Sequence, residues 1–308
     1  MESVLKTEVY SKPLVSIVLP TYNRAHLLDG AIQSCLDQTW KSIELIVVDD
    51  GSSDNTEEIA LAWAARDQRV CYVKQENGKI PRALNTGFKI ANGSLLTWTS
   101  DDNYYEQNAI EIMAMALQQH DQVGLVYCNV TVVDENNNIT EVSIRSSKSI
   151  SVENCVGACF MYRRSIAEIV GEYDPQTFLA EDYDYWLRIS KLAPIYHIPD
   201  VAPYRYRVHK QSHTNIRGAE AEIQAALVRV KYAGTKRERR IIMADGHRRA
   251  GTVLRTLGHH RAAFRHYIKS VRLNPYRAIS WRGLVAVREL FPGCASQSTI
   301  QQELTKWV

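Results

Sequence analysis

The sequence lacks the long apolar runs that membrane-spanning proteins carry. No run among its 308 residues approaches the roughly 18 apolar residues that are needed to cross a bilayer. Residues 1–12 also lack the apolar core of a secretory signal peptide. We therefore expect a cytoplasmic protein without a transmembrane helix.

Cysteine is present but lacks the spacing of a disulfide framework or of a zinc site. No CxxC pair occurs, and the cysteines are scattered through core-like segments. Cys155 and Cys159 could form a metal pair, but no second pair completes such a site. Free thiols in apolar segments fit a reducing compartment. The six cysteines are Cys35, Cys71, Cys128, Cys155, Cys159 and Cys294.

The charge is distributed unevenly along the chain. Residues 1–213 hold 19 Lys and Arg and 28 Asp and Glu, a net of −9. Residues 214–308 hold 18 Lys and Arg and 6 Asp and Glu, a net of +12. The overall charge of +3 therefore hides an acidic part and a basic tail. A tail of this kind indicates an acidic partner surface, which could be the other domain, an anionic membrane or nucleic acid.

Two short apolar runs near the N-terminus each stop abruptly at polar residues. Residues 15–19 continue into Pro-Thr-Tyr-Asn-Arg, and residues 45–48 continue into Asp-Asp-Gly-Ser-Ser-Asp. Short runs rich in Val and Ile are typical of buried parallel strands. Residues 25–38 between them have helical spacing, which predicts a β-α-β unit. Open α/β sheets bind ligands at the carboxyl ends of their strands, and we expect the ligand to be a nucleotide.

The rest of the chain predicts two domains of different character. An α/β pattern continues to about residue 213, and only helices are predicted beyond it, over residues 219–232, 239–257 and 261–273. We therefore predict domains of residues 1–213 and 214–308. Residues 251–275 resemble one tetratricopeptide hairpin, which cannot bury its apolar face alone. Further strands are predicted at residues 70–74, 94–99, 123–127, 129–133, 158–163, 195–198 and 204–208.

Pairs of carboxylates follow predicted strands or lie in loops. They are Asp49-Asp50, Asp101-Asp102 and Glu181-Asp182. Each pair by itself is better explained as a helix cap or a turn than as a binding site. Their shared position at strand ends and loops predicts one common cleft.

Five sequence blocks, in their order and spacing, resemble family 2 glycosyltransferases, and the run after residue 98 resembles the SpsA-like members. The resemblance covers about residues 13–213. It implies an α/β fold of the GT-A type, a Rossmann-like mixed sheet, and an inverting, metal-dependent enzyme. The blocks are Val15-Ser-Ile-Val-Leu-Pro-Thr-Tyr-Asn-Arg24, Leu45-Ile-Val-Val-Asp-Asp-Gly-Ser-Ser-Asp54, Ala83-Leu-Asn-Thr-Gly87, Thr99-Ser-Asp-Asp-Asn103 and Ala180-Glu-Asp-Tyr-Asp-Tyr-Trp-Leu-Arg188.

The resemblance implies a donor site for a nucleotide-sugar. Asp102 and His209 would bind Mn²⁺ or Mg²⁺, for which hard oxygen ligands are suited. Asp101 would contact the ribose, and Asp50 the pyrimidine. Thr99 stands where many relatives have a first Asp, as in SpsA-like members. The full nucleotide set is Thr21, Tyr22, Asp50, Lys79, Arg82 and Asp101, and further diphosphate candidates are Arg205, Arg207 and Lys210.

The same resemblance assigns the general base to Asp182. An inverting transfer needs a base that takes the proton of the acceptor hydroxyl. Glu181 on the acceptor side would raise the pKa of Asp182 by like charge. Asp184 is the rival base, with a role at a helix N-terminus as its alternative. Trp186 either walls the acceptor site or fills the core.

These residues predict a transferase that moves one sugar, with UDP as the first choice of nucleotide and TDP the second. The Gln-x-x-Arg-Trp motif of processive synthases is absent. The acceptor would be a saccharide or a lipid-linked saccharide in cell-envelope polysaccharide or glycolipid assembly. The alternatives are a nucleotidyltransferase, whose Gly-rich phosphate loop is missing, and a non-catalytic assembly protein.

The basic tail has three interpretations. Its charged residues either lie on solvated helix faces or dock on an anionic membrane. Nucleic-acid binding is the third, but no aromatic residues are interleaved as a stacking groove requires, so we expect no nucleic-acid partner. The helices could also form a homodimer.

Overall fold

Residues 1–209 form one structural unit and residues 210–308 form another. We call them unit 1 and unit 2. The computed structural model describes residues 12–144, 149–209, 212–276 and 283. Across these residues, no helix combines the length and the apolar character that membrane crossing requires.

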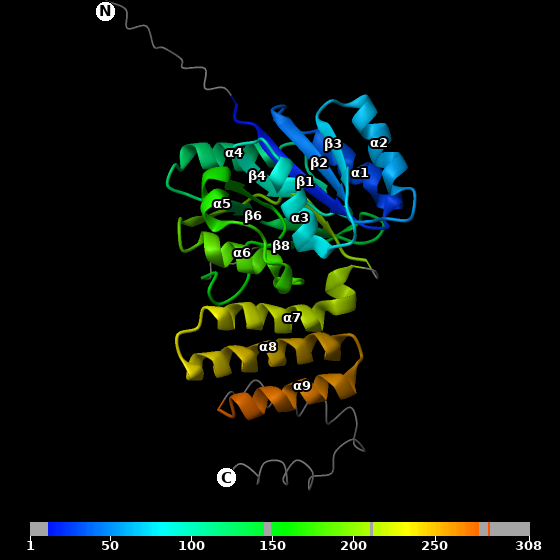
Figure 1. Ribbon diagram of the computed structural model, residues 1–308. Coiled ribbons are helices and arrows are strands. Elements are labelled where there is room, and N and C mark those ends of the chain that lie inside the picture. Colours follow the sequence, from blue (N-terminus) through cyan, green and yellow to red (C-terminus); the bar gives the residue numbers. More distant parts are fainter. Residues whose placement is uncertain (1–11, 145–148, 210–211, 277–282, 284–308) are drawn as a thin grey trace, which may run out of the picture. The chain divides into compact units, whose positions relative to one another are not determined.

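A seven-stranded mixed sheet runs through unit 1, in the order β10-β6-β9-β4-β1-β2-β3 (Figure 1). Neighbouring strands are parallel except around β9, which is antiparallel to both β4 and β6. The strands β1, β2 and β4 therefore end at one edge of the sheet. The strands are β1 (Val15–Thr21), β2 (Ile43–Asp49), β3 (Val70–Lys74), β4 (Leu95–Trp98), β6 (Leu125–Cys128), β9 (Phe160–Arg163) and β10 (Ile195–Ile198).

Helices cover both faces of this sheet. One apolar cluster joins α1, α2 and α4 to one face, and a second joins α3, α5 and α6 to the other. Because both faces are covered, strands such as β1 and β2 are buried along nearly their whole length rather than at alternate residues. The helices are α1 (Ala25–Leu36), α2 (Thr56–Arg66), α3 (Lys79–Ile90), α4 (Ala109–Gln119), α5 (Arg164–Val170) and α6 (Glu181–Ile189), and a 3₁₀ turn covers Pro175–Thr177.

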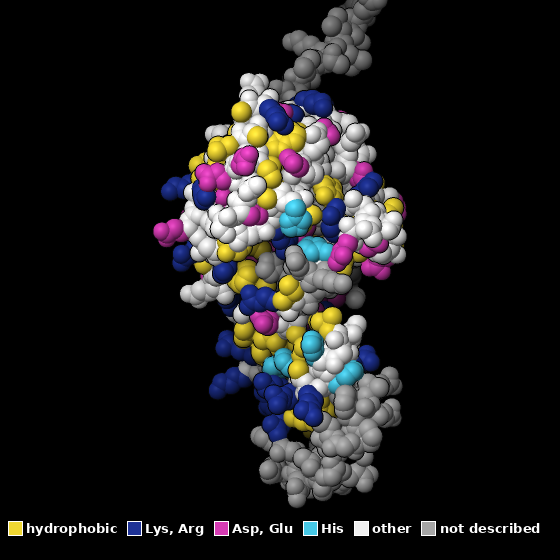
Figure 2. Space-filling model, turned by 90° about the vertical axis from the view of Figure 1, so that its right-hand side faces the viewer, with side chains coloured by type: hydrophobic (Ala, Val, Ile, Leu, Met, Phe, Trp, Pro, Cys, Tyr) yellow, Lys and Arg dark blue, Asp and Glu magenta, His cyan; other side chains and the backbone are white. Residues whose placement is uncertain are grey.

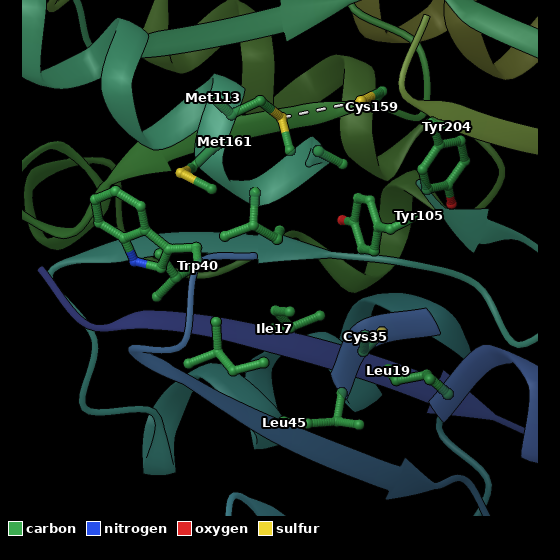
Figure 3. Close-up of a cluster of buried hydrophobic side chains, with 14 of the residues drawn as sticks. Ile17, Leu19, Cys35, Trp40, Leu45, Tyr105, Met113, Cys159, Met161 and Tyr204 are labelled. Carbon is green, nitrogen blue, oxygen red and sulfur yellow. Dashed lines mark hydrogen bonds between the residues drawn. The ribbon is translucent and has the colours of Figure 1, made fainter. Parts of the chain in front are cut away.

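The larger apolar cluster lies between the sheet and the helices α1 and α4 (Figure 3). Ile17 and Leu19 of β1 contribute to it with Cys35 of α1, and all three are fully buried. The Sγ atom of Cys159 lies 3.9 Å from the Sδ atom of Met113. The described cysteines form no disulfide bond with one another, and burial raises the pKa of Cys35 to about 12. Four of them, Cys35, Cys128, Cys155 and Cys159, are buried and serve as core residues, whereas Cys71 is exposed.

A smaller four-stranded sheet, in the order β5-β11-β7-β8, was only partly predicted. The strand β11 pairs with β5 in antiparallel fashion, with Tyr204 opposite Tyr105. The hydroxyl of Tyr204 also lies 2.7 Å from Oγ1 of Thr99. This pairing brings the chain after β4 next to the chain after β11. The strands are β5 (Tyr104–Tyr105), β7 (Val130–Val133), β8 (Ile139–Ser143) and β11 (Tyr204–Arg207).

Unit 2 contains the predicted helices, α7 (His213–Lys231), α8 (Lys236–Thr256) and α9 (His260–Leu273), which lie side by side in chain order (Figure 1). Small residues allow the close packing. A Cβ atom on Gly246 would lie 2.5 Å from Cβ of Ala226, so α7 and α8 approach closely there. Ser270 of α9 donates a hydrogen bond of 2.6 Å to the carbonyl of Ala244 in α8.

The described part of unit 2 is basic on the face shown in Figure 2, where Lys and Arg greatly outnumber Asp and Glu. Some of the basic side chains form ion pairs within unit 2. The buried carboxylate of Asp245 is paired with Arg248 at 2.9 Å, with Arg249 at 3.1 Å and with Arg229 at 3.7 Å. Other basic side chains are exposed along α9, namely Arg261, Arg265, Lys269 and Arg272.

Candidate active site

The carboxylates of Asp101 and Asp102 lie where the chain leaves β4, and both are buried. Since β4 pairs with β1, the residues that follow β1 lie beside them. Thr21 donates a hydrogen bond of 2.8 Å to Oδ2 of Asp101. Nη1 of Arg24 lies 3.1 Å from Oδ1 of Asp101 and 2.6 Å from Oδ2 of Asp102. One guanidinium therefore bridges the two carboxylates.

Burial raises the pKa of Asp101 to about 6. Arg24 lowers this pKa through its positive charge, and the negative charge of Asp102 raises it again. The charge of Arg24 therefore offsets part of the burial penalty on the ionised form of Asp101.

His209 joins this cluster through the small sheet. Its Nε2 atom lies 3.0 Å from Oδ2 of Asp102, although the two residues are 107 positions apart in the sequence. Their side chains are 11% and 10% exposed. The structure thus brings together the two residues that the sequence analysis assigned to a metal.

The donor set suits a divalent cation that binds together with a diphosphate. Asp102 and His209 supply one carboxylate and one imidazole. No group of three His, Cys, Asp or Glu side chains that could hold an ion occurs among the described residues. Mg²⁺ is commonly held by one or two carboxylates, with substrate phosphates and water as its other ligands. The two side chains fit that arrangement.

Asp50 organises the loop that begins α3. Its Oδ1 accepts hydrogen bonds from the backbone N–H of Gly78 at 2.7 Å and from the side chain of Gln75 at 2.7 Å. Its Oδ2 accepts one from the backbone N–H of Lys79 at 2.9 Å. Lys79 needs this support because its φ is +67°. Asp50 therefore holds this loop in place, in addition to the contact with the pyrimidine base that is predicted for it.

The other predicted nucleotide residues lie around this loop at the surface. Tyr22 follows β1 and is 48% exposed, so its ring is open for stacking. Arg82 lies one turn into α3 and is exposed. Its stem leaves no room for a side chain at residue 78, because a Cβ atom on Gly78 would lie 2.7 Å from Cδ of Arg82.

Asp182 lies in the first turn of α6 and is oriented by two hydrogen bonds. Asn154 donates from Nδ2 to Oδ2 of Asp182 at 2.8 Å, and the N–H of Tyr183 donates to Oδ1 at 2.6 Å. The hydroxyl of Tyr183 donates in turn to the carbonyl of Ile150 at 2.8 Å. The loop of residues 149–158 is thus fastened to the beginning of α6.

Glu181 is the more buried member of its pair. Burial, followed by the charge of Asp182, raises the pKa of Glu181 to about 8. The like-charge effect is therefore found on Glu181, and the effect predicted for Asp182 stays a prediction. Oε2 of Glu181 and Oδ1 of Asn154 are buried without a hydrogen-bond partner. Two polar oxygens beside Asp182 could thus accept or share a hydrogen bond with a bound hydroxyl.

Asp184 and Trp186 have structural roles. Asp184 accepts a hydrogen bond from Nε of Arg188 at 3.0 Å within α6, which favours Asp182 as the base. Trp186 is fully buried, and its ring centroid lies 4.5 Å from that of Phe160. The acceptor-side assignment of Trp186 is therefore corrected: the residue belongs to the core, because aromatic rings of β9 and α6 surround it.

Two of the three additional diphosphate candidates, Arg205 and Arg207, are engaged by side chains other than those of the carboxylate cluster. Arg207 donates from Nη2 to Oδ1 of Asn137 at 2.7 Å within the small-sheet region. Arg205 forms an ion pair of 2.6 Å with Glu106. Lys210 lies outside the described residues.

Arg24 and Asn154 received no role in the sequence analysis. Arg24 ends the Pro-Thr-Tyr-Asn-Arg run that was recognised as a strand end, so its position in the motif was a usable signal. Asn154 lies in a loop of irregular pattern, and only the folded chain shows that it contacts Asp182.

Comparison with known proteins gives consistent matches. The family model "Glycosyl transferase family 2" matches residues 16–171. An uncharacterized glycosyltransferase of Rickettsia prowazekii (strain Madrid E) is 35% identical over 223 residues, which cover 68% of this chain and 69% of the relative.

Two solved structures are similar in fold. The structure of S. aureus TarS 1-349 in complex with UDP-GlcNAc has a TM-score of 0.63 at 16% identity and covers 91% of each chain. The mannosyltransferase PcManGT of Pyrobaculum calidifontis, in complex with GDP-Man and Mn²⁺, has a TM-score of 0.59 at 18% identity. That match covers 92% of this chain and 89% of PcManGT.

Proposed function

The chain belongs to glycosyl transferase family 2 and has the predicted GT-A fold, and on this premise we propose that it is an inverting transferase of a single hexosyl group. The observation that carries the proposal is the contact of Asp102 with His209 beside Asp101 and Arg24. This cluster lies at the carboxyl edge of the sheet, where open α/β folds bind ligands.

The donor in this proposal is a nucleotide-diphosphate sugar, with UDP as the first choice and TDP as the second. Tyr22 offers an exposed ring for the base. Asp50 holds the loop that carries Lys79, and Arg82 follows one turn later. Thr21 donates a hydrogen bond to Asp101, which would contact the ribose. TarS in complex with UDP-GlcNAc supports UDP, whereas PcManGT binds GDP-Man.

The diphosphate side of the site would be held by Asp102 and His209 with Mn²⁺ or Mg²⁺. A bound divalent cation would supply the positive charge that stabilises the departing diphosphate. PcManGT with Mn²⁺ supports this part of the proposal.

Asp182 acts as the general base. Its carboxylate takes the proton of the acceptor hydroxyl as that oxygen forms a bond to the anomeric carbon. The bond from the anomeric carbon to the diphosphate oxygen breaks, and the nucleoside diphosphate leaves with the electron pair. Asn154 holds the carboxylate in place at 2.8 Å, and Glu181 offers a buried oxygen to the acceptor.

The acceptor is proposed to be a saccharide or lipid-linked saccharide of cell-envelope polysaccharide or glycolipid assembly. The enzyme would then work in the cytoplasm at the inner face of the membrane. Support comes from α9, which carries no Asp or Glu and exposes basic side chains at spacings of three and four residues, namely Arg261, Arg265, Lys269 and Arg272. Such a stripe is attracted to anionic lipids.

The proposal is tested by donor turnover. Purified protein, a panel of nucleotide-sugars and Mn²⁺ are incubated with a lipid extract as acceptor, and release of nucleoside diphosphate is measured. We expect release with one donor, and a loss of about 100-fold or more in Asp182→Asn with nucleotide binding retained. Asp184→Asn, the rival base, should retain far more activity. Release by Asp182→Asn at the wild-type rate would contradict the assigned base, and no release with any donor would contradict the proposed activity.

A further inference from the structure

Arg24 occupies a position where it can control access to the metal residues. Its guanidinium bridges Asp101 and Asp102, and its side chain is only 17% exposed. The backbone on either side of it is fixed, because the N–H of Asn23 donates to Ser52 Oγ at 2.9 Å and the N–H of Ala25 donates to Asp54 Oδ2 at 3.0 Å. The main chain is therefore held, so a displacement of the guanidinium would require rotation of the side chain of Arg24.

One oxygen atom, Oδ2 of Asp102, contacts both Arg24 and His209. Oδ2 of Asp102 lies 2.6 Å from Nη1 of Arg24 and 3.0 Å from Nε2 of His209. A guanidinium that donates to this oxygen is in the position that a cation bound to the same oxygen would need. The guanidinium of Arg24 and a cation bound to the same oxygen would also repel each other strongly, because both are positively charged and the site is mostly buried.

We propose that Arg24 is an internal counter-ion that competes with the divalent cation for Asp102 and, once displaced, binds the donor diphosphate. This inference rests on the proposed function, which assigns Asp102 to the cation. The guanidinium compensates the carboxylate pair until cation and nucleotide bind together. A planar guanidinium is then well suited to phosphate oxygens, which it can bind with two hydrogen bonds.

The proposal predicts opposite effects on two ligands when Arg24 is replaced. In Arg24→Gln, Mn²⁺ alone should bind about tenfold more tightly, because its competitor is gone. UDP at saturating Mn²⁺ should bind about tenfold more weakly, because a diphosphate contact is lost. A residue with a merely structural role would weaken both ligands together. Arg24→Lys keeps the charge and should remain close to wild type for Mn²⁺.

The experiment measures Mn²⁺ binding by electron paramagnetic resonance without nucleotide, and UDP binding by calorimetry with Mn²⁺. Arg69→Gln is the matched control, because Arg69 forms a similar pair of 2.7 Å with Asp67 away from the site. Thermal melting of each variant verifies that it is folded. Mn²⁺ binding to Arg24→Gln that is no tighter than to wild type would overturn the inference.

Asp102→Asn separates this inference from the proposed function. If Asp102→Asn loses Mn²⁺ binding while Arg24→Gln binds Mn²⁺ no more tightly than wild type, the assignment of Asp102 to the metal is supported and the competition is refuted. If Asp102→Asn binds Mn²⁺ like wild type, the metal assignment of the proposed function itself is refuted. Tighter Mn²⁺ binding in Arg24→Gln, together with weaker UDP binding, supports the competition.

Discussion

Replacing Glu181 by Gln tests whether its carboxyl group is held protonated in the folded enzyme. Burial and the neighbouring charge of Asp182 raise the pKa of Glu181 from 4.5 to about 8. The folded state therefore keeps a proton that the unfolded chain releases above about pH 4.5. The contribution of Glu181 to stability is complete below that pH and is lost as the pH rises through about 8.

The size of this loss follows from the two pKa values. Each pH unit between them is worth about 1.4 kcal/mol, so the free energy of unfolding falls by roughly 3 kcal/mol between about pH 4.5 and about pH 7 because of Glu181. Gln has nearly the shape of the protonated carboxyl group but does not ionise. Glu181→Gln should therefore remove this part of the pH dependence.

The assay is urea unfolding of the full chain at about pH 5, 7 and 9, followed by tryptophan fluorescence, with midpoints and slopes compared. Trp186 lies in the same helix as Glu181 and reports on this region. Glu172→Gln is the matched control, because the side chain of Glu172 is exposed. It should retain the pH dependence of wild type. A parallel loss of stability in wild type and Glu181→Gln between pH 5 and 9 would refute the reasoning.

Three further predictions concern packing, backbone and pH. Gly87→Ala should lower the free energy of unfolding by about 1–3 kcal/mol in urea titrations, because the new Cβ would lie 2.5 Å from Cγ1 of Val18. Gly171→Ala should cost about 1–3 kcal/mol by the same assay, purely through its backbone conformation (φ +81°, ψ −157°), since nothing lies within 4 Å of the new Cβ. Burial, then the nearby His266 and Lys269, lower the pKa of His247 to about 4. Because the unfolded chain takes up this proton first, the stability of α8 and α9 should fall as the pH drops from about 6.5 toward 4, and circular dichroism should show a smaller fall in His247→Gln.

Much of unit 1 was predictable because its strands are buried on both faces. Short runs rich in Val and Ile identified β1 and β2, and β3 and β10 begin and end at the predicted residues. The helices of unit 2 were predictable because their apolar residues recur at helical spacing, although α7 begins six residues earlier than predicted. These elements depend on local pattern and on burial, both of which can be read from sequence.

The small sheet was harder to predict, because its strands are short and partly polar. The strand β5 has only two residues, and β8 is largely exposed. Its long-range pairing of β11 with β5 brings His209 to Asp102. From sequence alone that contact came only from a family resemblance.

Individual site residues also have contacts that the sequence alone does not predict. Asp102 and Asp182 follow from motifs, whereas the bridging role of Arg24 depends on the side-chain direction in the folded chain. Trp186 lies next to the motif at the start of α6 but points into the core. A motif identifies which residues are near the site, and packing decides which of them reach it.

The central claim is that the cluster around Asp102 binds a nucleoside diphosphate with a divalent cation. Its most direct test is the thermal shift of wild type and Asp102→Ala with UDP or TDP, with and without Mn²⁺. A ligand that binds only the native state raises the melting temperature. We predict a rise that requires Mn²⁺ and disappears in Asp102→Ala. No shift with any nucleoside diphosphate, or an equal shift in Asp102→Ala, would contradict the account.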